Sequence, residues 1–168
     1  MIRFAKAIRT LAAAIVALLI IALPSAAVEQ KTQTTTQLSK RTVADKKPHR
    51  LILQVNTNDP AVMNLTLNNA TNVAQYYKDL DEKVSIEVVT FGPGLHMLRA
   101  DTSPVKARIA SIALSTPSIS FKACGNTRDN MHKAEEKDVP LVSEATVVKS
   151  GVVHVMELQE QGWTYVKP

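Results

Sequence analysis

The feature that most limits the folds open to this chain is a regular alternation of short apolar runs with helical patterns that open on a cap and a proline. Residues 50–56 (RLILQVN) form a run that is typical of a strand buried on both faces. Asp59 and Pro60 then supply an N-cap and a proline at the first helical position. The sequence therefore predicts a strand followed by an amphipathic helix. The apolar side chains of that helix recur at helical spacing, at Met63, Leu67, Ala70, Ala74 and Tyr77.

The same order of elements recurs in the next segment. A second strand is predicted over residues 84–91, and it ends at the Gly-Pro-Gly turn of residues 92–94. A Ser-Pro pair at residues 103–104 repeats the cap-and-proline signal. Pro117 ends this helix, and residues 119–123 make a third strand. The inward face of the helix is predicted to consist of Val105, Ile109 and Ile112.

Further elements complete the pattern. A shorter helix is expected to begin after Asn126 or Thr127 and to extend to about Lys137, and residues 146–148 are a fourth strand. Ser150 caps a last helix that ends at Gly162, and residues 163–166 form a fifth strand that fits a sheet edge. Alternation with short connections implies right-handed crossovers, so we predict an α/β fold, a three-layer αβα sandwich with a mostly parallel five-stranded sheet. The residues of the last helix that are predicted to face inward are Val152, Val155 and Met156.

The amino terminus has the three parts of a secretory signal peptide. It has a cationic start without acidic residues, an apolar run at residues 11–23, and the small residues Ser25 and Ala27, which fit a cleavage before residue 28. The apolar run is shorter than the roughly 20 residues of a membrane span, so an uncleaved anchor is the less favoured alternative. We expect an exported, periplasmic protein without stable membrane insertion once residues 1–27 are removed.

Removal of the signal changes the charge balance. The full chain has 20 basic and 15 acidic residues, and the signal holds three of the bases, which leaves 17 against 15. A net charge of about +2 argues against a nucleic-acid-binding protein, which needs clustered bases and stacking aromatic side chains. Residues 28–48 are polar and rich in Thr, Gln and Lys, so we expect a flexible tether. Residues 49–168 have the size of one domain with its own core.

Ligands of open parallel sheets gather outside the carboxyl ends of the strands, and three predicted loops begin there. All three are rich in residue types that expose the backbone or suit unusual dihedral angles, although ordinary turns need the same residue types. The glycines at 92 and 94 lack the following Lys-Ser/Thr of a phosphate loop and a full dinucleotide fingerprint. The candidate ligand-binding residues in and beside these loops are Asn56, Asp59, Gly92, Gly94, His96, Gly125 and Asn126.

The single cysteine, Cys124, stands at the predicted turn from the third strand into a helix. A lone thiol cannot form an internal disulfide, so it is either a buried structural side chain or a reactive one. Gly125 and Asn126 let backbone N–H groups turn toward the sulfur, and the start of a helix lowers the pKa of a cysteine. Basic side chains follow at positions 128, 132 and 133. We therefore predict that Cys124 is a catalytic thiolate within reach of solvent.

Other chemistries have weaker support. A Cys/His site for cuprous ion would use His96 or His132, with Met97 or Met131 as a soft ligand. The chain has no close-spaced pair such as Cys-x-x-Cys or His-x-x-x-His, so neither a metal site nor a cofactor is predicted. The absence of a Gly-x-Ser-x-Gly elbow argues against a serine hydrolase of the α/β type.

Five segments of the domain occur together in a known protein family. They are LILQVNTNDP at residues 51–60, NNA at 68–70, FGPG at 91–94, FKACGNT at 121–127 and GWTY at 162–165. Together they resemble the DsrE/DsrF-like family, in its exported branch, over nearly all of residues 49–168. The resemblance implies a three-layer α/β fold with a five-stranded sheet and assembly into homotrimers or hexamers.

The resemblance also implies a chemistry for Cys124. Intracellular members of the family carry sulfur as a persulfide on a cysteine during sulfur oxidation or tRNA thiolation. An exported protein does not serve a cytoplasmic tRNA relay, and this chain has no second cysteine, so its sulfur would have to pass to a separate partner. The partner implied is a sulfur donor or acceptor protein. The resemblance thus implies a persulfide carrier or sulfurtransferase-like relay. The alternatives are a non-catalytic module of the cell envelope that binds a small ligand or metal, and a self-assembling domain with a structural cysteine.

Overall fold

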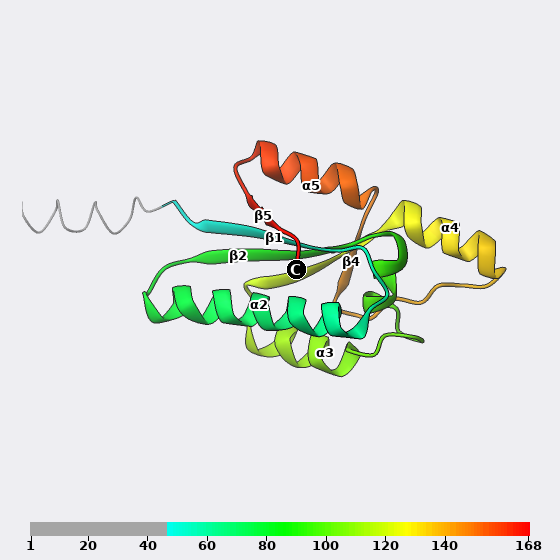
Figure 1. Ribbon diagram of the computed structural model, residues 1–168, viewed down its shortest axis with the longest axis horizontal. Helices are drawn as coiled ribbons and strands as arrows, with labels where there is room; N and C mark the ends of the chain where they lie inside the picture. The colour runs from blue at the N-terminus through cyan, green and yellow to red at the C-terminus, as the bar shows by residue number, and fades with distance from the viewer. Residues whose placement is uncertain (1–46) are drawn as a thin grey trace, which may run out of the picture. The chain divides into compact units, whose positions relative to one another are not determined.

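The computed structural model describes residues 47–168, in which strands and helices alternate along the chain (Figure 1). Five parallel strands form one sheet in these residues, in the order β4-β3-β2-β1-β5, which confirms the predicted α/β fold. The strands are β1 (His49–Val55), β2 (Val84–Thr90), β3 (Ile119–Cys124), β4 (Ala145–Val148) and β5 (Thr164–Val166). The helices are α2 (Pro60–Asp79), the 3-10 helix η1 (Gly92–Leu98), α3 (Lys106–Ser115), α4 (Gly125–Glu135) and α5 (Gly151–Glu160).

Two sequence predictions concern residues outside this range. The signal peptide of residues 1–27 and nearly all of the tether of residues 28–48 lie outside the described residues. Within residues 47–168, none of the helices combines the length and the apolar character that crossing a lipid bilayer requires.

Helix α2 begins where the cap-and-proline signal placed it. The Asp59 carboxylate accepts a hydrogen bond from the backbone N–H of Ala61 at 2.8 Å, and Pro60 is the first helical residue. The proline ring fixes φ near the helical value, and its missing N–H would have had no partner in the first turn. The predicted inward residues Met63, Leu67, Ala70 and Ala74 are buried, and Tyr77 is half-buried.

The serines predicted to cap later helices behave differently. Ser150 stands at the N-cap of α5, but its side chain makes no capping hydrogen bond. The Ser103 hydroxyl donates to the Met97 carbonyl at 2.6 Å and accepts from the Val105 N–H at 3.3 Å, and α3 starts only after Val105. The Ser-Pro pair therefore marks the turn before α3 and not its first residue.

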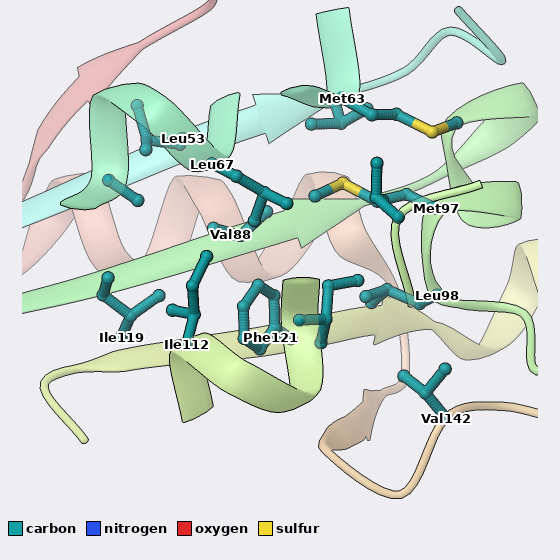
Figure 2. Packing of buried hydrophobic residues seen from close by; sticks show 14 of the residues in the cluster. Leu53, Met63, Leu67, Val88, Met97, Leu98, Ile112, Ile119, Phe121 and Val142 are labelled. Atoms are coloured by element: carbon teal, nitrogen blue, oxygen red, sulfur yellow. The ribbon is translucent and has the colours of Figure 1, made fainter. Parts of the chain in front are cut away.

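Helices α2 and α3 cover one face of the sheet and enclose the main core (Figures 1 and 2). Successive side chains of a strand face opposite sides, so alternate residues of β1, β2 and β3 enter this core. Figure 2 shows Leu67 of α2, Val88 of β2 and Phe121 of β3 in the cluster, and all three are buried. The 3-10 helix η1, which was predicted only as a turn at residues 92–94, adds the buried residues Leu95, Met97 and Leu98.

Helix α5 packs on the opposite face of the sheet (Figure 1), where it forms a smaller cluster. Its buried residues Gly151, Val155 and Leu158 recur at i, i+4 and i+7. The prediction that Val152 and Met156 also face inward is wrong, because these side chains are 50% and 55% exposed. The helix turns its glycine side toward the sheet, and this lets the start of α5 lie close to β3. The buried members of the cluster are Ile52, Val89, Val155 and Leu158.

Helix α4 extends beyond the carboxyl ends of the strands (Figure 1). It begins at Gly125 and ends at Glu135, so both ends lie slightly earlier in the chain than predicted. None of its residues is buried.

The last turn of α4 is held by Arg99, whose side chain is 1% exposed. Its guanidinium donates to Glu135 at 2.9 Å and to Asp101 at 2.7 Å. No sequence pattern predicted this ion-pair cluster, because Arg99 and Glu135 lie far apart in the chain.

Candidate functional site

The carboxyl ends of β1 to β4 meet at one edge of the sheet, because these strands are parallel and adjacent. The three predicted loops start at this edge, after β1, β2 and β3. A fourth segment, residues 149–151 after β4, also starts there and leads into α5. No role in the site was predicted for this fourth segment, although a Ser-Gly pair after a strand is a signal for a close helix start.

Cys124 is the last residue of β3 and the N-cap of α4, which is the predicted strand-to-helix turn. Its backbone is extended (φ −69°, ψ 116°), as is usual for an N-cap residue, and the free N–H groups of the first helical turn follow it. The start of α5 packs against it, since a β carbon added to Gly151 would lie 3.2 Å from the Cys124 Cβ. The residue is 4% exposed, so the expectation of a solvent-reachable sulfur is wrong for this conformation.

The surroundings of the sulfur favour its ionised form. Burial raises the pKa of the Cys124 thiol, but hydrogen bonds to the sulfur outweigh burial and hold the pKa below its usual value. The largest of these lowering contributions comes from the Thr127 hydroxyl, followed by the backbone N–H groups of Gly151, Thr127 and Asn126. These N–H groups belong to the first turns of α4 and α5. The pKa of the thiol is therefore lowered by two helix starts, whereas the sequence predicted only one.

Thr127 links the cysteine to the loop after β2. Its hydroxyl oxygen accepts a hydrogen bond from the Gly92 N–H at 3.0 Å, which leaves the hydroxyl proton for the sulfur. Gly92 has φ +54°, a region that glycine adopts without strain. Thr127 was part of the sequence motif but was given no role. The signal that identifies it is its place at the third helical position, from which a side chain reaches back to the N-cap.

Gly94 and Gly125, predicted to bind a ligand, have close packing roles. A β carbon on Gly94 would lie 2.1 Å from the Val55 carbonyl oxygen and 2.8 Å from the Asn56 Cα. One on Gly125 would lie 3.2 Å from the Val148 carbonyl oxygen. The absence of a side chain at position 94 therefore lets the loop after β2 lie against the end of β1, beside the half-buried Asn56.

Not all predicted binding residues join the cysteine. Asp59 caps α2, and the His96 Nδ1 hydrogen-bonds to the Thr102 hydroxyl at 2.9 Å. In residues 47–168 no hydrogen bond connects Asp59 or His96 to the cysteine loop. Asn126 does lie at the sulfur, and its N–H also donates to the Lys149 carbonyl at 3.1 Å, which ties the first turn of α4 to the segment after β4.

A cleft of about 530 Å³ lies beside the cysteine loop. One end is formed by Asn126 and Ser150, and the cleft then follows α5. The His154 Nε2 is hydrogen-bonded to Glu87 on β2 at 2.7 Å. A second groove, of about 570 Å³, lies between α2 and the β1–β5 edge and contains none of the candidate site residues. The lining of the first cleft consists of Asn126, Val148, Lys149, Ser150, Val153, His154 and Glu157.

The described part of the chain contains no group of three or more His, Cys, Asp or Glu side chains that could hold a metal ion. His132, one of the residues considered for such a site, is exposed on α4 and hydrogen-bonds through Nδ1 to the Lys137 carbonyl at 2.8 Å. The described geometry offers one thiol, that of Cys124, whose pKa is lowered by the donors of neighbouring segments.

Comparison with known proteins places the chain in a family. No known protein-family profile matches it, and no curated protein matches it. The solved structure of MTH1491 from Methanobacterium thermoautotrophicum, a protein of unknown function, matches with a TM-score of 0.59 and 31% sequence identity. The match covers 71% of this chain and 99% of MTH1491. This chain belongs to the same family as MTH1491.

The family of MTH1491 shares this α/β fold, but the function of MTH1491 is itself unknown, so the match assigns no activity. The part of this chain that matches MTH1491 has about the size of the domain at residues 49–168. The resemblance to the DsrE/DsrF-like family stays a prediction, and the function is inferred from the geometry around Cys124.

Proposed function

We propose that the protein is an exported, periplasmic sulfur carrier of the DsrE-like type, which holds sulfane sulfur as a persulfide on Cys124. The observation that carries the proposal is the position of one unpaired cysteine at the N-cap of α4 with the start of α5 packed against it. The Thr127 hydroxyl and the N–H groups of Gly151, Thr127 and Asn126 lower the pKa of the thiol in this position. Donors in this position stabilise the thiolate, which is the form that attacks sulfur.

The transfer step follows from this arrangement. The Cys124 thiolate attacks the outer sulfur of a polysulfide or persulfide, a new S–S bond forms on Cys124, and the donor S–S bond breaks. The electron pair of the broken bond leaves with the inner sulfur of the donor. The chain has no second cysteine, so the thiolate of a separate acceptor must remove the sulfur and restore Cys124.

The sequence supports the remaining parts of the proposal. The signal-like residues 1–27 support export to the periplasm, and the segment FKACGNT supports a DsrE-like carrier. The same resemblance supports assembly of this chain into a homotrimer or hexamer, with a sulfur donor or acceptor protein as a further partner.

Intact mass measurement tests the carrier function. The mature protein is incubated with polysulfide, and we expect wild type to gain the mass of one sulfur atom and Cys124→Ser to gain none. Absence of the added sulfur on wild type, or its presence on Cys124→Ser, would count against the proposal. Treatment with a small thiol should remove the sulfur and restore the original mass.

The 4% exposure of Cys124 favours a second candidate function. In this alternative the protein is a non-catalytic module of the cell envelope, which binds a small ligand in the cleft beside a structural cysteine. Ellman's reagent separates the two functions. A thiol that reacts in the native protein supports the carrier, and one that reacts only after unfolding supports the binding module.

A further inference from the structure

The outer side of α5 carries an apolar stripe. Its members Val152, Val153 and Met156 are 50%, 49% and 55% exposed. At about 100° of rotation per residue they span an arc of about 100°, which lies roughly opposite the buried side of the helix. Figure 1 shows α5 on the side of the sheet away from α2 and α3. The stripe therefore faces away from the core, where a helix normally carries polar side chains.

The charged residues at the two ends of α5 run against the helix dipole. Lys149 is exposed two residues before the helix, and Glu157 and Glu160 are exposed in its last turn. The amino end of a helix carries a partial positive charge and the carboxyl end a partial negative charge, so these residues stand at the less favourable ends. In the part of the chain that the structure describes, none of the three side chains has a hydrogen-bond or ion-pair partner. An antiparallel copy of the same helix would bring each end beside its opposite.

One two-fold axis satisfies both the stripe and the charges. Positions 153 and 156 have their midpoint between residues 154 and 155, and positions 149 and 160 have the same midpoint. A second α5 related by an axis at this midpoint places Val153 against Met156 and Lys149 opposite Glu160, and each pair occurs twice. The flexible four-carbon stem of the lysine covers the difference between helical spacing and the extended Ser150 that precedes the helix. The surface is therefore complementary to itself.

We propose that α5 is a self-association surface, on which a second copy of this chain docks its own α5 antiparallel to the first. The charges fix the direction of the second helix, because a parallel copy would place Lys149 beside Lys149 and Glu160 beside Glu160. Neither Cys124 nor the carrier function enters this contact. A two-fold contact doubles the assembly that the rest of the surface makes, so we expect a dimer, or a hexamer where three-fold contacts also form. A homotrimer alone has no two-fold axis and would leave the stripe exposed.

Sedimentation velocity of the mature protein measures this association. A contact made mainly by one helix per copy is smaller than the roughly 800 Å² per partner of stable interfaces, so we expect a micromolar dissociation constant. The mass of wild type should therefore double between about 1 µM and about 500 µM. A reducing agent keeps a disulfide between two Cys124 thiols from contributing. Met156→Gln, which removes an apolar side chain from each copy, should weaken the association about tenfold.

Charge reversal tests the antiparallel direction. Lys149→Glu alone and Glu160→Lys alone should each stay at half the size, because each brings two pairs of like charges together. An equimolar mixture of these two variants should recover the doubled size, since both pairs then carry opposite charges. The matched controls Asp129→Lys and Lys133→Glu reverse exposed charges on α4 and should associate as wild type does.

Three results would overturn the proposal. The first is a wild type whose mass stays constant over the whole concentration range. The second is an association that Met156→Gln leaves unchanged. The third is a mixture of the two charge-reversed variants that stays at half the size. Far-ultraviolet circular dichroism of each variant confirms that the fold is kept, as expected for substitutions of exposed residues.

Discussion

Replacing Arg99 by methionine is expected to destabilise the domain by about 3 kcal/mol near neutral pH. The guanidinium is 1% exposed and makes four charged hydrogen bonds, two to Asp101 and two to Glu135. Removing one partner of a buried ion pair costs about 3–5 kcal/mol. The lower end of this range applies because the Asp101 and Glu135 side chains are 34% and 29% exposed, so water can solvate them after the guanidinium is gone.

The pH dependence of this loss has a defined sign. The hydrogen bond from Arg99 is the largest cause that holds the pKa of Asp101 at about 2, below 3.8, and the pKa of Glu135 at about 2, below 4.5. A carboxylate whose pKa is lower in the folded chain than in the unfolded chain stabilises the fold above its unfolded pKa. The contribution is complete above about pH 5 and is lost as the pH falls toward about 2. The difference in stability between wild type and Arg99→Met should therefore close over this interval.

Urea unfolding followed by circular dichroism, repeated between about pH 7 and about pH 3, measures the difference in unfolding free energy. The matched control Lys137→Met removes a 59% exposed ammonium that lies 3.3 Å from a Glu135 oxygen. Its expected effect is below about 0.5 kcal/mol, because exposed ion pairs are weak. A destabilisation of Arg99→Met that stays the same from pH 7 to pH 3 would refute the electrostatic reasoning and assign the effect to lost packing.

Three further predictions follow from particular contacts. Thr127→Val should raise the pKa of Cys124 and Thr127→Ser should not, because only valine removes the hydroxyl donor. The pH profile of iodoacetamide alkylation measures the pKa of each variant, and equal profiles would contradict the assigned role of the Thr127 hydroxyl. Gly94→Ala places a β carbon 2.1 Å from a β1 carbonyl oxygen, so the thermal midpoint of the variant should fall by more than about 10 °C. An unchanged midpoint would show that the loop after β2 shifts away from β1 at little cost. Val155→Ala should cost about 1–3 kcal/mol in urea unfolding and Met156→Gln less than about 0.5 kcal/mol, since Val155 is 7% and Met156 55% exposed; equal costs would place the buried face of α5 elsewhere.

The inward face of α5 shows why a local pattern was insufficient at one element. Apolar residues at positions 152, 153, 155, 156 and 158 contain more than one stripe at helical spacing. The sheet selects the stripe with Val155 and Leu158, because the side that carries Gly151 can approach Phe91 and Cys124 most closely. The start of α2 was predicted correctly because Asp59 and Pro60 act within one helical turn.

Local signals place Cys124 at the junction between a strand and a helix, because strand ends and caps act on their near neighbours in the chain. The surroundings of the sulfur depend instead on tertiary packing. Gly92 and Gly151 come from the segments after β2 and β4, and the order of parallel strands brings both to the end of β3. The same approach buries the thiol and supplies its hydrogen-bond donors. Contacts between segments so far apart depend on strand order, which no local pattern of residues encodes.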